Sequence, residues 1–171
     1  SGSSLLSIGG ALTVSSGTLN LNATSTTRTL NVTGNFVQSG GTLDGGSVNT
    51  AIGPTSTINL SGNFSKSSGS FTNTASTTSF TLNFGNSGSQ SFTNSGTFTY
   101  ANININSGSI LTALSDIPNA NGVFTVNGTL DLDAFQITNL YSSSVVTING
   151  VLKTKKSVGL SDSPATTSSA I

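Results

Sequence analysis

Thr29-Leu30-Asn31-Val32-Thr33-Gly34-Asn35-Phe36 returns in near-identical form 28 positions later, as Thr57-Ile58-Asn59-Leu60-Ser61-Gly62-Asn63-Phe64. In both stretches apolar residues alternate with polar ones, which predicts a short strand with one buried and one exposed face. Gly and Asn follow the alternation, and both accept the positive φ angles that tight corners require. The repeat therefore predicts a short strand followed by a corner, used more than once.

Seven windows with the pattern apolar-polar-apolar recur along the chain, and a glycine follows each within a few residues. They begin at Leu12, Leu30, Ile58, Leu82, Ile103, Phe124 and Val146, at spacings of 18, 28, 24, 21, 21 and 22 residues. A recurrence in the twenties is typical of a repeat architecture. We therefore expect an all-β protein, a right-handed parallel β-solenoid (β-helix) of about seven coils with three short strands per coil. This single domain spans residues 1–160, and the polar residues 161–171 are expected to be a tail or linker.

Stacked coils place equivalent inward side chains in columns. The first expected column is Leu12, Leu30, Ile58, Leu82, Ile103, Phe124 and Val146, and the second is Val14, Val32, Leu60, Phe84, Ile105, Val126 and Ile148. Between the columns stand outward asparagines that can hydrogen-bond along the stack: Asn31, Asn59, Asn83 and Asn104. A β-sandwich also uses short alternating strands, but the repeated corners and the in-register copies favour the solenoid.

Composition excludes several classes of function. Hydrophobic residues make up 33% of the chain and charged residues only 6%, with a net charge of zero. One Arg and four Lys are too few for the basic stripe of a nucleic-acid-binding protein. The run of about twenty apolar residues that membrane insertion needs is missing. Without His or Cys the chain has no disulfide, no zinc site and no Ser or Cys triad of the usual form. We expect no enzyme activity and no cofactor.

Several degenerate repeats resemble those of a known group of proteins. They are Gly34-Asn35-Phe36 through Gly40-Gly41-Thr42-Leu43, Val126-Asn127-Gly128-Thr129-Leu130 and Gly150-Val151-Leu152-Lys153. With Ser, Thr, Asn and Gly as filling and very little charge, they resemble the parallel β-solenoids of bacterial surface and secreted proteins. The nearest types are filamentous-haemagglutinin-like adhesins and autotransporter passenger domains. The resemblance covers about residues 8 to 160 and implies an extracellular or cell-surface, non-catalytic shaft or adhesive segment. It carries over no catalytic residue.

Asp131 and Asp133 are the one close pair of acids. Flanked by inward Leu130 and Leu132, both are expected to project from one strand face about 7 Å apart. That separation suits a calcium contact or the carboxylate pair of a polysaccharide lyase or hydrolase. No third oxygen-rich motif or Arg accompanies the pair, so two solvated charges are the simpler interpretation.

Other residues are candidates for a binding face. Asp44 and Asp116 begin or lie in expected loops, 44–54 and 115–122, and loops of solenoids often carry the binding surface. Tyr100 and Tyr141 can stack on sugars, or lie half-buried at corners. A module that binds carbohydrate or ice through an outer face or one of these loops is therefore an alternative function.

Two further patterns have an ordinary explanation. Lys153, Lys155 and Lys156 can meet an anionic surface glycan, but lysines on a terminal strand also deter further strand pairing. Pairs such as Thr55-Ser56-Thr57 and Thr97-Phe98-Thr99 suit an ice-binding array, which needs Thr at one position on every coil. The uneven spacing of the coils argues against that register.

A solenoid has two open ends with unpaired backbone groups, and its terminal coils need caps. Neither end of the sequence has an amphipathic capping helix. We therefore expect the ends to meet neighbouring repeats or other copies stacked end to end, as in a structural shaft or fibre subunit.

Overall fold

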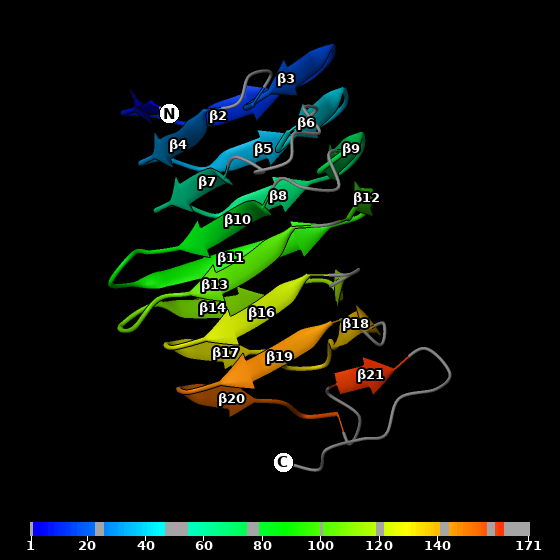
Figure 1. Cartoon of the computed structure of the whole chain (residues 1–171). Coiled ribbons are helices and arrows are strands. Elements are labelled where there is room, and N and C mark those ends of the chain that lie inside the picture. Colours follow the sequence, from blue (N-terminus) through cyan, green and yellow to red (C-terminus); the bar gives the residue numbers. More distant parts are fainter. Residues whose placement is uncertain are drawn as a thin grey trace.

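The computed structural model of the chain describes residues 2–22, 26–46, 55–74, 79–99, 101–118, 122–140, 144–156 and 160–162. Every element in these residues is a β-strand, and every strand pair is parallel. The strands coil around one axis and stack from the N-terminal to the C-terminal end (Figure 1). The expected all-β parallel β-solenoid with three strands per coil is confirmed.

Two sides of the coil are continuous seven-stranded sheets. Sheet A contains β1 (Ser3–Ile8), β4 (Thr27–Val32), β7 (Thr55–Leu60), β10 (Ser79–Phe84), β13 (Asn102–Ile105), β16 (Val123–Val126) and β19 (Val145–Ile148). Sheet B contains β2 (Leu12–Val14), β5 (Phe36–Gln38), β8 (Phe64–Lys66), β11 (Ser89–Asn94), β14 (Ile110–Ala113), β17 (Thr129–Asp131) and β20 (Val151–Lys153).

The third side is divided into two sheets that do not pair with each other. Sheet C contains β3 (Thr18–Asn20), β6 (Thr42–Asp44), β9 (Ser70–Thr72) and β12 (Thr97–Phe98). Sheet D contains β15 (Ile117–Pro118), β18 (Ile137–Leu140) and β21 (Leu160–Asp162). Strand β21 thus includes the first two residues of the segment interpreted as a tail, and residues 163–171 lie outside the described part.

The register of sheet A stacks the inward residues in two columns. One column contains Leu6, Leu30, Ile58, Leu82, Ile103, Phe124 and Val146, and the other Ile8, Val32, Leu60, Phe84, Ile105, Val126 and Ile148. The prediction that Leu12 and Val14 begin these columns is wrong. They lie in β2 of sheet B, where Leu12 is in register with Phe36. An apolar-polar-apolar triplet fits either sheet, so the pattern alone does not say which side of the coil it occupies.

Stacked phenylalanines fill the middle of the solenoid. In one stack Phe36, Phe64 and Phe92 have ring centroids 4.9 Å apart at each step and interplanar angles of 10° and 5°. Phe71 and Phe98 form a second stack at 4.8 Å. Rings of the two stacks meet edge to face, for example Phe64 and Phe71 at 5.4 Å. Both are favourable aromatic geometries, so identical residues on successive coils lock the coils in register.

Outside sheet A, asparagines form a side-chain ladder. Its members in order are Asn31, Asn59, Asn83, Asn104, Asn127 and Asn149. Each Nδ2 donates to the Oδ1 of the preceding asparagine over 2.8–3.3 Å. After Asn104 the register position is occupied by Thr125, and the ladder continues at Asn127, just past the end of β16. The outward asparagines therefore tie the coils together from outside.

The corner between sheets B and C depends on glycine in the first three coils. Gly17, Gly41 and Gly69 have φ values of 69°, 63° and 79°, a region that side chains disfavour. They also stack directly, because a Cβ on Gly41 would lie 2.6 Å from the carbonyl oxygen of Gly17. In the fourth coil only Ser95 and Gly96 separate β11 from β12, and Gly96 has no positive φ. The corner of the fifth coil, 114–116, has no glycine, and sheet C ends before it.

We expect Phe64→Ala to lower the free energy of unfolding by about 3–5 kcal/mol, because the ring is fully buried between Phe36 and Phe92. Phe64→Leu retains most of the apolar volume and is expected to lose about 1–2 kcal/mol. Equilibrium urea unfolding measures both. A loss below about 1 kcal/mol in the alanine variant contradicts the assignment of the stack as the centre of the core.

Candidate functional site

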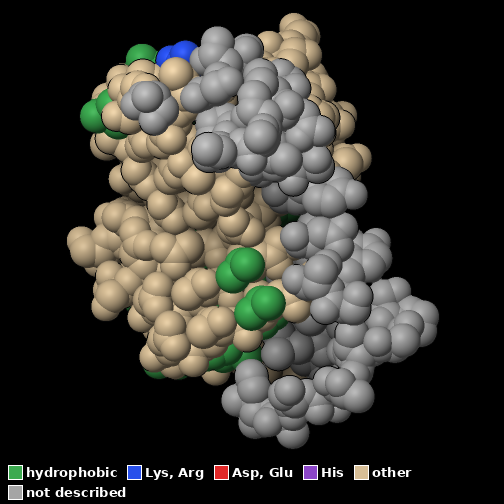
Figure 2. Space-filling view, viewed as in Figure 1, with side chains coloured by type: hydrophobic (Ala, Val, Ile, Leu, Met, Phe, Trp, Pro, Cys, Tyr) green, Lys and Arg blue, Asp and Glu red, His purple; other side chains and the backbone are tan. Residues whose placement is uncertain are grey.

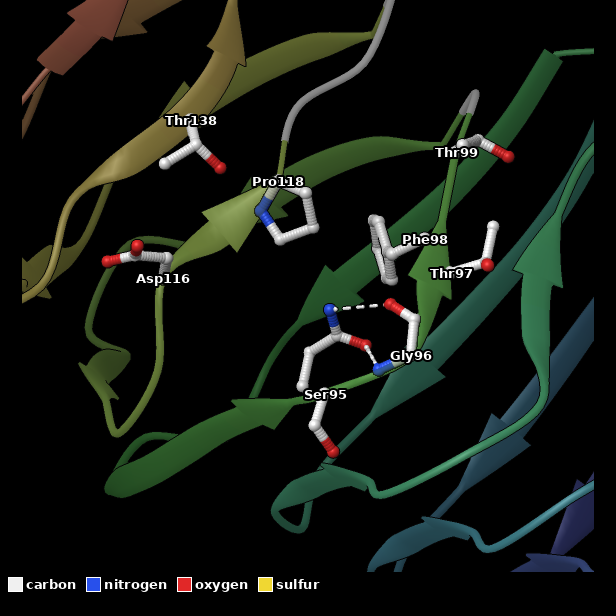
Figure 3. A pocket seen from close by; sticks show the side chains of 9 residues that line it. Ser95, Gly96, Thr97, Phe98, Thr99, Asp116, Pro118 and Thr138 are labelled. Carbon is white, nitrogen blue, oxygen red and sulfur yellow. Dashed lines mark hydrogen bonds between the residues drawn. The ribbon is translucent and has the colours of Figure 1, made fainter.

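A groove lies where the third side of the solenoid is divided, between β12 and β15 (Figure 3). Its volume is about 400 Å³, in the range of small-molecule sites. Phe98 and Pro118 contribute its apolar wall, and Asp116 and Thr138 add polar groups from the side of sheet D. The groove interrupts the strand stacking on the third side, between sheets C and D, and its lining is partly apolar and partly polar.

The groove exists because the backbone ladder between the fourth and fifth coils stops at this corner. Leu114 still donates its N–H to the carbonyl of Phe92 at 2.8 Å. Two residues further on, the N–H of Asn94 donates to the Ser115 hydroxyl at 2.8 Å, where the regular ladder would offer a carbonyl. Pro118 lacks an N–H, which confines proline to edge strands, and β15 is an edge of sheet D.

Asp116 is exposed at the rim of this groove. One oxygen, Oδ1, accepts the N–H of Gln136 at 3.1 Å and thereby fixes the carboxylate. The Asn94 amide on the opposite side is bonded to Gly96 in both directions. The groove therefore presents one oriented carboxylate beside hydroxyl groups and an apolar wall, a set that suits a neutral polyhydroxylated ligand.

The other carboxylate proposed for a binding face, Asp44, is buried with 5% of its surface exposed. Its Oδ1 accepts the N–H groups of Gly46 and Thr74, each at 3.1 Å, and its Oδ2 accepts the Thr74 hydroxyl at 2.6 Å. This carboxylate joins two coils at a corner, so it is a structural group and does not face a ligand.

Two tyrosines and two loops are the remaining candidates for a binding face. Tyr100 and Tyr141 lie outside the described residues, as do 47–54 and 119–121 of the two expected loops. The loop expected over 115–122 is in part a strand, because Ile117 and Pro118 form β15 and are buried.

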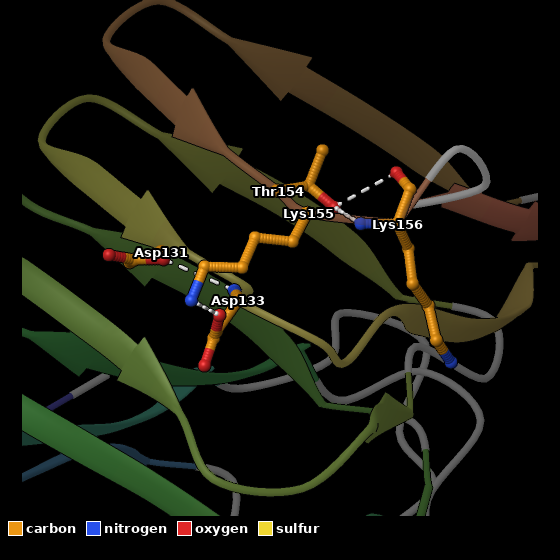
Figure 4. Close-up of polar contacts among 5 residues, drawn as sticks. All are labelled: Asp131, Asp133, Thr154, Lys155 and Lys156. Carbon is orange, nitrogen blue, oxygen red and sulfur yellow. Dashed lines mark hydrogen bonds and ion pairs between the residues drawn. The ribbon is translucent and has the colours of Figure 1, made fainter.

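Asp131 and Asp133 do not project from one strand face (Figure 4). Strand β17 ends at Asp131, and Asp133 lies beyond it with φ of 45°, in the left-handed region. Asp131 Oδ1 accepts the N–H of Asp133 at 3.1 Å, and Asp133 forms an ion pair with Lys155. The expectation that both acids project from one strand face is therefore wrong, because Asp133 lies past the end of β17 and is paired with Lys155.

Lys153, Lys155 and Lys156 are all exposed near the C-terminal coil. The hydrogen bond to Asp133, with that residue's charge, raises the pKa of Lys155 above its ordinary value. Lys156 donates its backbone N–H to the Thr154 hydroxyl, and its side chain extends away from the acids (Figure 4). The side chains of Lys155 and Lys156 therefore do not converge on one point, as an anion site would require (Figure 4).

Lys66 was missed by the sequence analysis. It is fully buried on the inward side at the end of β8, in register with Gln38 on the preceding coil and Asn94 on the following coil. Its Nζ donates to the carbonyl of Gly69 at 2.7 Å, and burial lowers the pKa of the amine below 10.5. The signal was present, because alternation from the buried Phe64 places the residue two positions later on the inward side.

Among the described residues, no group of three or more His, Cys, Asp or Glu comes together to hold a metal ion. That part of the chain also has no helix of the length and hydropathy that crossing a membrane requires. Comparison with models of known families, with curated proteins and with solved structures finds no match to the chain.

We expect Lys66→Gln to raise the free energy of unfolding at neutral pH by about 1 kcal/mol, because a neutral amide replaces an ammonium without a counter-ion. The folded pKa of Lys66 lies below the value of 10.5 in the unfolded chain, so unfolding takes up a proton between these two values. Wild-type stability therefore rises with pH through that window, and the advantage of the variant shrinks as pH approaches 10.5.

Urea unfolding from neutral pH to pH 10.5 measures this difference. The exposed Lys153→Gln is the matched control and is expected to show no such trend. If the difference in free energy of unfolding between Lys66→Gln and wild type stays constant from neutral pH to pH 10.5, the lowered pKa assigned to Lys66 is contradicted.

Proposed function

We propose that the chain is a non-catalytic structural and adhesive segment of a bacterial extracellular surface protein. In this role it forms part of a shaft whose ends stack on neighbouring solenoid coils or on other copies of the chain. The abundance of neutral Ser, Thr and Asn and the resemblance of the repeats to surface solenoids support an extracellular location.

The observation that carries the proposal is the apolar N-terminal coil. Leu5 and Leu6 are 66% and 62% exposed on β1. Beside them is a hollow of about 160 Å³ lined in part by Leu19 and Leu30. In the described part of the chain, β1, β2 and β3 are each the last strand of their sheet. Such an edge is a template for pairing with another strand.

The two ends of the stack differ in charge. The strands β1, β2 and β3 contain no charged residue. The last strand of sheet B, β20, carries the exposed Lys153, followed by Lys155 and Lys156. Lysines at an edge oppose additional strand pairing. The N-terminal coil is therefore the end that we propose for the stacking contact.

Sedimentation velocity over a range of concentrations tests the contact. We expect reversible self-association of the chain and an association constant at least about tenfold lower in Leu6→Lys, which puts a charge on the exposed edge. Leu114→Lys is the matched control, because Leu114 is 53% exposed at a corner away from both ends. A chain that stays monomeric at millimolar concentration, or two variants that associate equally, contradicts stacking through this end.

A second candidate function, carbohydrate binding, is favoured by the groove beside Asp116. Its oriented carboxylate, its hydroxyl groups and the apolar surface of Pro118 match the mixed surface of a sugar ring.

We expect a glycan array to find a ligand that binds at least about tenfold more weakly to Asp116→Asn than to wild type. The amide retains an oxygen for the N–H of Gln136 but removes the charged acceptor. Asp131→Asn is the control, since Asp131 lies away from the groove. A blank array, or equal binding by both variants, removes the groove as a sugar site.

A further inference from the structure

On three adjacent strands of sheet A the outer face carries small uncharged polar side chains in a regular array, which ends at Leu5 on β1 and at Asn102 on β13. Across β4, β7 and β10, one outward position is Thr29, Thr57 and Thr81, which are in register. The position two residues earlier is Thr27, Thr55 and Ser79, and the position two residues later is Asn31, Asn59 and Asn83. The points of this array are separated by about 4.8 Å between strands and about 6.6 Å along a strand.

The register shows that uneven coil spacing does not disturb this array. The spacings differ because residues are inserted in loops, whereas the strands of sheet A stay paired residue for residue. The pairs that come into register are Thr27 with Thr29, Thr55 with Thr57, and Ser79 with Thr81. The expectation that uneven coil spacing breaks the register is therefore wrong for these three strands.

Hydrogen bonds between side chains hold the array in place. The hydroxyls of Thr27 and Thr55 lie 3.2 Å apart. The asparagines beside them form the ladder described above, with Asn59 and Asn83 each donating over 2.8 Å. Beneath lies the buried core of Ile58, Leu60 and their stacked equivalents. The outward groups are thus ordered before any ligand arrives, which reduces the entropy cost of binding.

Sheet B of the same coils provides an internal comparison. Its outward positions in β5, β8 and β11 are Val37, Ser65 and Thr93. These residues also stack in register, yet they vary in character, so the fold does not require a constant outer residue. Repetition of the same residues on β4, β7 and β10 therefore points to a role for this part of sheet A.

We propose that the outer face of β4, β7 and β10 binds the surface of an ice crystal. The threonine hydroxyls and asparagine amides donate to and accept from water molecules at fixed, repeated points. Threonine methyl groups between those points exclude disordered water. A single bound water contributes little because its ordering costs entropy, so a crystal is held only when many prepositioned groups bind water together.

Two observations favour ice over a crystalline polysaccharide. Charged groups hold their own hydration shells, and the described side of the molecule seen in Figure 2 is mostly uncharged polar and backbone surface. Arg28, on β4, alternates to the other side of its strand and donates to the Ser4 hydroxyl at 2.6 Å. Flat polysaccharides are commonly held by exposed aromatic rings, whereas the phenylalanines of sheet A in the described residues, Phe80, Phe84 and Phe124, are buried.

Thermal hysteresis and ice recrystallisation measurements on the whole chain test the proposal. We expect wild type to inhibit ice growth, and Thr57→Lys, in the centre of the array, to need at least about tenfold more protein for the same effect. Ser65→Lys makes the same change on sheet B of the same coil, where Ser65 is exposed, and is expected to match wild type. Thermal unfolding of both variants establishes that they are folded.

Sedimentation of wild type and the two lysine variants with insoluble chitin and cellulose distinguishes an ice-binding face from one that binds a crystalline polysaccharide. Wild-type protein without effect on ice overturns the proposal, as does an equal effect of the two lysine variants. Polysaccharide binding that Thr57→Lys removes, without activity on ice, also overturns it and assigns the face to a glycan. None of these outcomes depends on the end contact, so this proposal and the shaft proposal succeed or fail separately.

Discussion

Parallel, in-register pairing between coils is the constraint on which the rest of this structure depends. It places each residue directly over its equivalent, about 4.8 Å away, so any property of one residue is repeated along the stack. Phenylalanines then stack face to face inside, as Phe36, Phe64 and Phe92 do. Outside, Asn31 and Asn59 bond through their amides. When the same neutral residue occurs at the same position on successive coils, its copies lie in contact and stabilise the stack.

The same constraint explains the unusual composition. A charged residue repeated on every coil would lie over its own copy at strand spacing, where like charges repel. Charged residues make up only 6% of the chain, and the few present are isolated or paired. Lys66 lies alone between Gln38 and Asn94, and Lys155 lies beside Asp133. Ser, Thr, Asn and Gly take the places that charged residues occupy on the surface of other proteins.

Corners decide where the regular stack is interrupted. Glycines such as Gly41 and Gly69 turn the chain with positive φ and stack closely, so the third strands of the first coils pair. Where the corner changes to Ser115 and Asp116, the third side begins a new sheet and a groove opens. Sheets A and B are unaffected, because their pairing continues through all seven strands. Two uninterrupted sides of the solenoid and a groove on the third side therefore coexist in one molecule.

Much of the fold was predictable from the sequence, because alternation and repetition are local properties. The two columns from Leu30 and Val32 onward and the outward position of Asn59 follow from period-two alternation alone. The side occupied by Leu12 was not predictable, since the same triplet serves sheets A and B.

The candidate sites were much less predictable. Asp44 and Asp133 lie at corners, where backbone conformation and the neighbouring coil decide whether a carboxylate is exposed, buried or paired. The register of Thr29, Thr57 and Thr81 was hidden by loops of unequal length. The sequence by itself determined the strands, their inward faces and their repetition, because each depends on neighbouring residues only. The tertiary structure alone decided which coils meet at each corner and which outer residues align, because loops absorb insertions while the backbone ladder keeps the strands in register.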